Sequence, residues 1–290
     1  MHHEAAPRIP AKLVAACRLT PEREAWLKRL PALLADLQRR WGFSAHAPFD
    51  GEGVSAAWVA RVTRDDGTRA VLKLGMPHFE AEHEVLGLRF WDGDPTVRLL
   101  AADEAVGAML LENCDPGTPL TSLPEAEQDI VIADLLRRLW RSPKEKHPFR
   151  PLSALTAHWA EAARRQADQW WDPVLVGEGL RLLEELPRSA PEQVLLATDL
   201  HAGNVLRARR KPWLVIDPKP FVGDPAYDAT QHLLNCAGRV LAESDRTLRG
   251  FAERLKVDHE RVRLWLFARL AAEPGDDWRH LRPLARVLAP

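Results

Sequence analysis

The residues best suited to chemistry lie in a short polar loop in the second half of the chain. Asp199 and Asn204 stand five positions apart between apolar runs, and Asp217 follows thirteen residues later, after the run Trp213–Ile216. Carboxylate and amide oxygens ligate a hard divalent cation, and a free carboxylate can accept a hydroxyl proton. This combination is what phosphoryl transfer from a magnesium-bound nucleotide to a hydroxyl substrate requires.

A β-hairpin would bring these residues together. The basic turn 209–212 separates two strand-like runs, so Asn204 and Asp217 would lie at the same end of the hairpin. The D-x4-N spacing alone also occurs in ordinary turns, where Asp and Asn are common. The correctly spaced Asp217 and the following string Gly223-Asp-Pro-Ala-Tyr-Asp228 favour the functional interpretation.

The elements before this loop divide the chain into a β-rich part and a helical part. The N-terminal segment predicts a helix that Thr20 caps, with Pro21 at its first position and a break or kink at Pro31. Asp66-Gly67 between two β-prone runs predicts a hairpin, and Lys73 lies on its second strand. Alone, Lys73 would be an ordinary solvated strand residue. Short strands are predicted over residues 58–62, 70–74, 97–101 and 105–111, a helix over residues 80–91, and mainly helices beyond residue 119.

Together these motifs resemble the aminoglycoside phosphotransferases, and within them the streptomycin 6-kinase and hydroxyurea phosphotransferase branch. The similarity covers residues 51–228 and rests on Asp199-Leu-His-Ala-Gly-Asn204, Ile216-Asp-Pro-Lys219, the string ending at Asp228, Lys73, and the hinge Leu111–Gly117. It implies an α+β, bilobal, protein-kinase-like fold. We expect a small β-rich N-lobe over residues 1–113 and a larger helical C-lobe over residues 114–290.

The resemblance implies that Asp199 positions and deprotonates the substrate hydroxyl, while Asn204 and Asp217 ligate Mg²⁺. Many kinase-like enzymes have His two residues before the catalytic Asp, where this chain has Ala197, so the geometry of the loop is less certain than its chemistry. His201 is interpreted as a packing residue of the loop rather than a catalytic group. The sequence Asp217-Pro-Lys in place of Asp-Phe-Gly fits a small-molecule kinase.

The nucleotide, ATP or GTP, would be held by the N-lobe. Lys73 would bind the α- and β-phosphates, oriented by a helical carboxylate. We expect this partner to be Glu84, with Glu80, one turn earlier on the same face, as the alternative. A phosphate-covering loop is predicted at Gly51, Gly53 and Ser55, where two glycines could equally form a simple turn. The backbone from Glu112 to Cys114 would meet the adenine edge, or serve only as a linker.

Substrate-binding residues are less well defined. A polycationic aminoglycoside needs carboxylates in its pocket, for which we consider Asp228, Glu273, Asp276 and Asp277. The last three could instead form an exposed acidic turn. Some of the 11 Trp residues could stack on a substrate, although Trp at helical spacing is more often core.

Composition excludes several classes of protein. The 40 Lys+Arg against 41 Asp+Glu give a net charge of -1, without the basic excess of a nucleic-acid binder. No run is long enough to span a membrane, so no membrane partner is expected. The three widely spaced cysteines form no disulfide framework and favour reduced thiols in the cytoplasm.

We therefore predict an ATP-dependent O-phosphotransferase, acting on a hydroxyl of an aminoglycoside or aminocyclitol antibiotic such as streptomycin. The alternatives are a kinase of hydroxyurea or another small hydroxylated metabolite, a pseudokinase scaffold, and a small protein kinase. Presence of all four residues Lys73, Asp199, Asn204 and Asp217 argues against a scaffold. The short spacing between Asp217 and Gly223 leaves no activation segment for a protein kinase. The oligomeric state and the acceptor hydroxyl stay open.

Overall fold

The computed structural model describes residues 7–51, 56–273 and 279–290. The chain forms two compact units, one of residues 1–117 with 207–214 and one of residues 118–206 with 215–290. Residues 207–214 thus group with the first unit, whereas we had assigned them to the C-lobe. None of the helices in the described ranges is long and apolar enough to cross a membrane.

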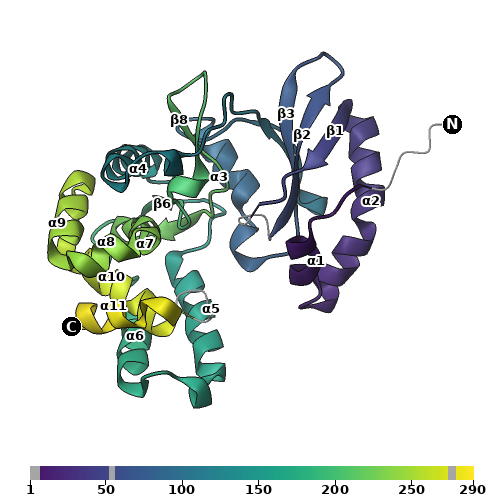
Figure 1. The fold of residues 1–290 in the computed structure, drawn as a ribbon. Helices are drawn as coiled ribbons and strands as arrows, with labels where there is room; N and C mark the ends of the chain where they lie inside the picture. Colours follow the sequence, from purple (N-terminus) through teal and green to yellow (C-terminus); the bar gives the residue numbers. More distant parts are fainter. Residues whose placement is uncertain (1–6, 52–55, 274–278) are drawn as a thin grey trace. The chain divides into compact units, whose positions relative to one another are not determined.

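The first unit is built on one antiparallel sheet of order β1-β2-β3-β5-β4. Its strands pair in register around Lys73, which lies opposite Val59 on one side and Met109 on the other. Two helices, α1 and α2, lie along one face of this sheet (Figure 1). The elements are α1 (Ala11–Cys17), α2 (Pro21–Trp41), β1 (Phe43–Pro48), β2 (Ala57–Arg64), β3 (Arg69–Gly75), η1 (Phe79–Ala81), α3 (Glu84–Trp91), β4 (Leu99–Asp103), η2 (Glu104–Val106) and β5 (Ala108–Glu112).

The long helix α2 begins as predicted but does not break. The Thr20 hydroxyl accepts a hydrogen bond from the Arg23 N–H at 3.3 Å, and the helix continues through Pro31 to Trp41. Burial of an apolar stripe against the sheet outweighs the missing hydrogen bond of one proline. The stripe is formed by Trp26, Leu30, Leu34 and Leu37.

Alternation along β3 separates the core from the functional lysine. Leu72 and Leu74 pack into the cluster formed with α1 and α2, which also buries Cys17. Successive side chains of a strand point to opposite faces, so Lys73 lies on the other face. The sequence pattern of this strand therefore directs one charged side chain away from the helices.

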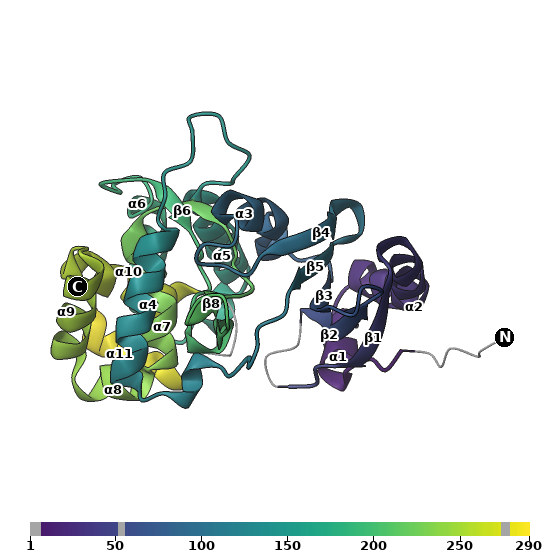
Figure 2. The same cartoon turned by 90° about the horizontal axis from the view of Figure 1, so that it is seen from above.

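The second unit is mainly helical and contains one small strand pair, with a second pair at its boundary with residues 207–214. Figure 2 shows α4, α7 and α10 packed side by side, and α10 also contacts α6, α9 and α11. The core includes Trp265, Tyr227 and the buried thiol of Cys236. The elements are η3 (Leu120–Ser122), α4 (Glu125–Leu139), α5 (Leu152–Arg165), η4 (Ala167–Gln169), α6 (Pro173–Glu185), β6 (Val194–Leu196), η5 (Ala202–Asn204), β7 (Val205–Arg207), β8 (Trp213–Val215), β9 (Phe221–Gly223), α7 (Pro225–Asn235), α8 (Ala237–Ala242), α9 (Ser244–Leu255), α10 (His259–Ala272), η6 (Arg279–Leu281) and α11 (Arg282–Leu288).

The strand pairs frame the predicted loop. β6 pairs with β9 in antiparallel register, and β7 pairs with β8.

Three of the tryptophans, Trp58, Trp91 and Trp265, are at most 1% exposed and serve as core rather than as a substrate wall.

Candidate active site

A buried ion pair joins the sheet to α3 in the first unit. The Lys73 Nζ donates to both carboxylate oxygens of Glu84 at 2.6 Å. Lys73 is 9% exposed and Glu84 2% exposed. The structure therefore selects Glu84 over Glu80 as the partner of Lys73, because Glu80 lies in the separate turn η1. Lys73 comes from β3 and Glu84 from the first turn of α3, so sheet and helix together fix the ammonium.

The hinge carboxylate is used inside the first unit. Glu112 accepts hydrogen bonds from the Arg210 guanidinium at 2.9 and 2.7 Å and from the Arg98 N–H at 3.0 Å. Burial opposes ionisation of this carboxyl, but these donors outweigh it and lower the pKa of Glu112. Arg210 also donates to the carbonyl oxygens of Gly93 and Thr96 at 2.7 and 3.0 Å. These contacts explain why residues 207–214 group with the first unit.

The structure describes two of the other predicted nucleotide contacts, Cys114 and Gly51. Cys114 is buried, and this burial raises the pKa of its thiol to about 11, so only its backbone is suited to an adenine edge. Gly51 is exposed, with nothing within 4 Å of the position of a Cβ. Gly53 and Ser55 lie outside the described residues, so the phosphate-covering loop stays a prediction.

The chain from β6 to just past the end of β8 brings together Asp199, Asn204 and Asp217, the residues predicted to act in phosphoryl transfer. The Asn204 side-chain amide donates to the Asp199 carbonyl oxygen at 3.0 Å, and the Ile216 N–H donates to the Asn204 carbonyl oxygen at 2.9 Å. Asp217 therefore follows directly from a residue bonded to Asn204. All three side chains are half-buried. The predicted juxtaposition of Asn204 and Asp217 arises from this loop and hairpin.

Two residues of this array have an unusual backbone conformation. Thr198 has a φ of 47° and Asp217 a φ of 53°, in the left-handed region that L-residues rarely adopt. Thr198 is held there by hydrogen bonds from its hydroxyl to the Lys219 carbonyl oxygen at 2.6 Å and from its N–H to Asp228 at 2.8 Å. Strained conformations of this kind persist where surrounding contacts over-determine them, typically at functional sites.

Lys219 links the loop of Asp199 to Asp217, the predicted metal-binding aspartate. Its Nζ forms an ion pair with the Asp217 carboxylate, and its N–H donates to the Ala197 carbonyl oxygen at 2.8 Å. Lys219 is 7% exposed. In the sequence, Lys219 is apparent only as the last residue of the motif Ile216-Asp-Pro-Lys219, and its position two residues after Asp217 is the signal that could assign it a role.

Asp228 supports the loop rather than a substrate. Its carboxylate is 1% exposed and accepts hydrogen bonds from the backbone N–H groups of Ala197 and Thr198 at 3.0 and 2.8 Å and from the Trp140 indole at 3.0 Å. Burial raises the pKa of this carboxyl to about 6. The substrate-binding role predicted for Asp228 does not fit this placement, because a carboxylate enclosed by three protein donors cannot meet a soluble ligand.

His201 is a loop-packing residue in the structure. Its Nδ1 accepts a hydrogen bond from the Gly203 N–H at 3.2 Å. Burial lowers the pKa of this imidazole, which is consistent with a neutral acceptor. A Cβ at Gly203 would lie 2.7 Å from His201 Cε1, so the imidazole packs directly against this glycine.

Of the other acidic residues predicted to bind the substrate, the structure describes Glu273 but not Asp276 or Asp277. Glu273 forms an ion pair with Arg269, and its side chain is 15% exposed. Burial alone would lower the pKa of Arg269, but the carboxylates of Glu273 and Asp199 contribute to raising it. Glu273 is therefore an internal partner of a buried arginine. Asp276 and Asp277 lie outside the described residues.

Comparisons with known proteins show which family the chain resembles. The family model of aminoglycoside/hydroxyurea antibiotic resistance kinases matches residues 43–277. The chain is 37% identical over 276 residues to streptomycin 6-kinase of Streptomyces glaucescens, covering 90% of this chain and 88% of that protein. It is 38% identical over 253 residues to hydroxyurea phosphotransferase of Kitasatospora aureofaciens, covering 84% of this chain and 72% of that protein.

Solved structures agree on the fold. Choline kinase LicA from Streptococcus pneumoniae has a TM-score of 0.65 at 14% identity, covering 89% of this chain and 97% of that chain. Macrolide 2'-phosphotransferase type I has a TM-score of 0.57 at 17% identity, covering 83% of this chain and 88% of that chain. The predicted α+β kinase-like fold is thereby confirmed.

Proposed function

The chain belongs to the aminoglycoside/hydroxyurea antibiotic resistance kinase family, and we propose that it transfers the γ-phosphoryl group of ATP to a hydroxyl of an aminocyclitol antibiotic of the streptomycin type. The observation that carries this proposal is the array of Asp199, Asn204 and Asp217 on one hydrogen-bonded loop and hairpin. The substrate class rests on the relatives named streptomycin 6-kinase.

Asp199 is the proposed general base. Its side chain is half-buried. The backbone of the two preceding residues is held by hydrogen bonds, from the Thr198 N–H to Asp228 and from the Lys219 N–H to the Ala197 carbonyl oxygen. A fixed carboxylate can orient the acceptor hydroxyl and take its proton as the new bond to phosphorus forms. Most of the rate enhancement would come from positioning and electrostatics, which suits a loop held by so many hydrogen bonds.

Lys73 is the proposed phosphate ligand of the first unit. The carboxylate of Glu84 contacts its ammonium through both oxygens, which holds the charge at a defined point. A lysine held in this way can bind nucleotide phosphates as a point charge. GTP carries the same phosphates as ATP and would contact Lys73 in the same way. Selection between the two nucleotides would therefore depend on the hinge residues that face the base.

Asn204 and Asp217 are the proposed ligands of Mg²⁺. Amide and carboxylate oxygens fit a hard cation, which commonly takes one or two protein ligands and completes its shell with water and phosphate oxygens. When bound, the cation would neutralise charge on the nucleotide phosphates.

Hydroxyurea is the second candidate acceptor, because a relative of that name is 38% identical over 253 residues. The same residues would serve both reactions, so the structure of the phosphotransfer site does not separate them. The two acceptors differ in size and charge, and parallel assays distinguish them directly.

The test is a phosphorylation assay on purified protein with ATP and Mg²⁺, using streptomycin and hydroxyurea as separate acceptors. We expect a phosphorylated product with streptomycin, detected by mass spectrometry. Asp199→Asn should lower kcat by at least about 100-fold, since it removes the base. Asp134→Asn, on an exposed helical carboxylate of the same unit, is the matched control and should leave kcat unchanged. Wild-type rates in Asp199→Asn would refute the mechanism, and no product from either acceptor would refute the substrate class.

A further inference from the structure

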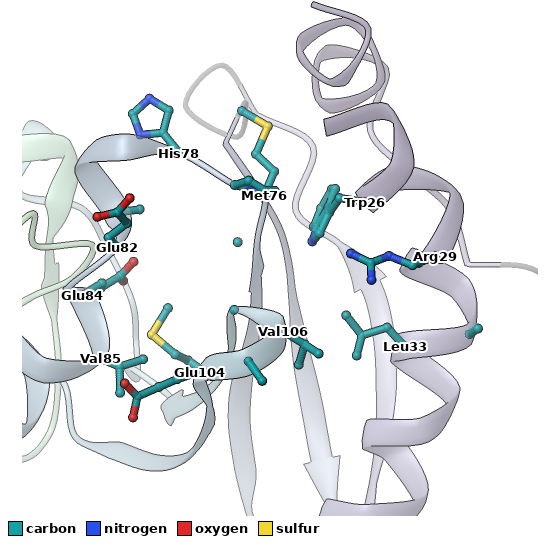
Figure 3. A pocket seen from close by; sticks show the side chains of 17 residues that line it. Trp26, Arg29, Leu33, Met76, His78, Glu82, Glu84, Val85, Glu104 and Val106 are labelled. Carbon is teal, nitrogen blue, oxygen red and sulfur yellow. The ribbon is translucent and has the colours of Figure 1, made fainter. Parts of the chain in front are cut away.

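A cavity in the first unit lies between α2 and α3. Of the residues assigned a role above, Glu84 borders it. The cavity has a volume of about 530 Å³ and is bordered by α2, the segment after β3, the start of α3, and η2. This volume falls within the usual range for small-molecule sites. Figure 3 shows that the side chains around it come from two distinct walls, one on α2 and one on α3 and its neighbours.

The α2 wall presents two hydrogen-bond donors. Trp26 is only 4% exposed, and its indole Nε1 has no hydrogen-bond partner in the structure. Arg29 lies one helical turn further on, and its guanidinium forms no ion pair with any described residue. Figure 3 shows the nitrogen edge of Trp26 and the guanidinium of Arg29 both turned toward the open space. A buried donor without an acceptor is uncommon and calls for a partner.

Two of the carboxylates around the cavity are already paired. Glu84 is paired with Lys73, and Glu104 is paired with Arg89. Arg29 is exposed, and it is the cationic side chain of the α2 wall that has no protein counter-ion among the described residues. An anionic group beside α2 would therefore find a charge partner there.

Apolar side chains complete the site. Leu33 of α2, Met76 after β3, Val85 of α3 and Val106 of η2 all border the cavity. They offer a surface on which a flat hydrophobic body could be removed from water. Methionine is well suited to such a surface because its flexible thioether adapts to different shapes.

We propose that this cavity binds a small carboxylate with an apolar, aromatic body. The carboxylate accepts hydrogen bonds from the Trp26 indole N–H and the Arg29 guanidinium, and the body packs against Met76, Leu33 and Val106. A charge-assisted pair with arginine supplies orientation, and apolar burial supplies most of the affinity. This site is separate from the proposed acceptor site on Asp199, which lies in the other unit.

The test measures binding of biphenyl-4-acetate, with biphenyl-4-acetamide as its uncharged counterpart, by calorimetry on the full chain. We expect saturable 1:1 binding of the acid, at least about tenfold tighter than the amide. Arg29→Gln should reduce the affinity for the acid to that for the amide. Trp26→Phe keeps a ring but removes the N–H, and should weaken binding of the acid about fivefold. Lys28→Gln makes the same charge change at an exposed residue of the same helix and should change neither affinity.

Several results would overturn the proposal. These are no saturable binding of the acid, equal affinities of wild-type protein for acid and amide, or an equal loss of affinity in Lys28→Gln. Tighter binding of the corresponding amine, biphenyl-4-methylamine, would show that the α3 wall dominates. Circular dichroism of Arg29→Gln, a change at an exposed side chain, verifies that this variant is folded. Because binding is measured without turnover and circular dichroism alone verifies folding, the binding result does not depend on the proposed function.

Discussion

At the scale of single residues, the contact between Lys73 and Glu84 makes a sharp test of nucleotide binding. Glu84→Gln would leave the ammonium with a neutral partner in a nearly closed environment. A buried charge that loses its partner is destabilised and free to reorient. We expect kcat/KM for ATP to fall by about tenfold or more, measured by steady-state kinetics at saturating acceptor.

Glu80→Gln is the matched control for this variant. Glu80 precedes α3 in the chain and lies in η1, whereas the partner that Lys73 contacts through both carboxylate oxygens is Glu84. It should retain kcat/KM for ATP within about twofold of wild type. An equal loss in both variants would mean that acidic charge near α3, rather than the specific pair, governs nucleotide binding.

Asp228 makes a prediction about pH. Its pKa in the folded protein, about 6, lies above its ordinary value, so the native state binds an extra proton between about pH 4 and pH 6. The stability that Asp228 contributes is therefore complete below about pH 4 and is lost as the pH rises to about 6. Relative to Asp228→Asn, which does not titrate, the wild-type free energy of unfolding should fall by about 3 kcal/mol across this window.

Urea titrations of both proteins from pH 4 to pH 7 give this difference. The variant also exchanges a carboxylate oxygen for an NH₂ group opposite backbone donors, which lowers its stability by an amount that does not change with pH. A difference that grows between pH 4 and pH 6 would contradict the prediction. It would show that the three donors stabilise the ionised carboxylate by more than burial destabilises it.

The proximity of Asp199, Asn204 and Asp217 was the most predictable part of the site, since residue type and spacing predicted a loop and hairpin that bring them together. Two other roles depend on distant contacts. Asp228 follows Asp199 by many residues, and only the fold reveals that it binds the backbone N–H of Thr198. The ion pair of Glu273 with Arg269 likewise turns a plausible substrate ligand into an internal contact.

At the scale of elements, close helix packing distinguishes two glycines on α6. A Cβ at Gly179 would lie 2.8 Å from the Cβ of Ala271 and 3.1 Å from that of Ala272, both on α10. A Cβ at Gly177 would meet nothing within 4 Å. Gly179→Ala should therefore destabilise the protein by about 1–3 kcal/mol through overpacking. Gly177→Ala, its control on the same helix, should stabilise it by about 0.5–1 kcal/mol through backbone entropy and helix propensity.

Chemical denaturation of the two variants beside wild type measures both effects. The opposite signs are the essential outcome, because one substitution fills space that α10 occupies and the other fills solvent. If both variants lost stability equally, the close approach of α6 and α10 would be wrong.

Elements were predicted where local signals agreed and missed where tertiary contacts decided. The hairpin around Gly67 and the cap at Thr20 follow from local turn and cap chemistry. The helix through Pro31 does not, because burial of its apolar stripe outweighs one missing hydrogen bond. The grouping of residues 207–214 with the first unit depends on Arg210 reaching Glu112, a contact across 98 positions of the chain.

At the scale of the whole molecule, many of the charged side chains form ion pairs with one another. The net charge of -1 arises from nearly equal numbers of acids and bases. Many of these are exposed helical pairs that contribute little. A few, such as Lys73 with Glu84 and Arg261 with Asp224, are buried and define local geometry.

The division into two units gives the buried cysteines a practical use. Cys17 and Cys114 belong to the first unit and Cys236 to the second, and all three thiols are free and buried. Burial raises the pKa of Cys114 and of Cys236 to about 11. Alkylation by iodoacetamide at pH 8 should therefore be at least about 100-fold slower in the native protein than in urea, as followed site by site by mass spectrometry. Rapid labelling of native protein would contradict this.

Each thiol thus reports the local opening of the unit that contains it. If the two units unfold separately, Cys236 will become reactive at a different urea concentration from Cys17, and if they unfold together, the two labelling curves will coincide. A ligand that binds one unit alone will then slow alkylation in that unit first. The three native thiols therefore report the stability and the ligand occupancy of each unit separately.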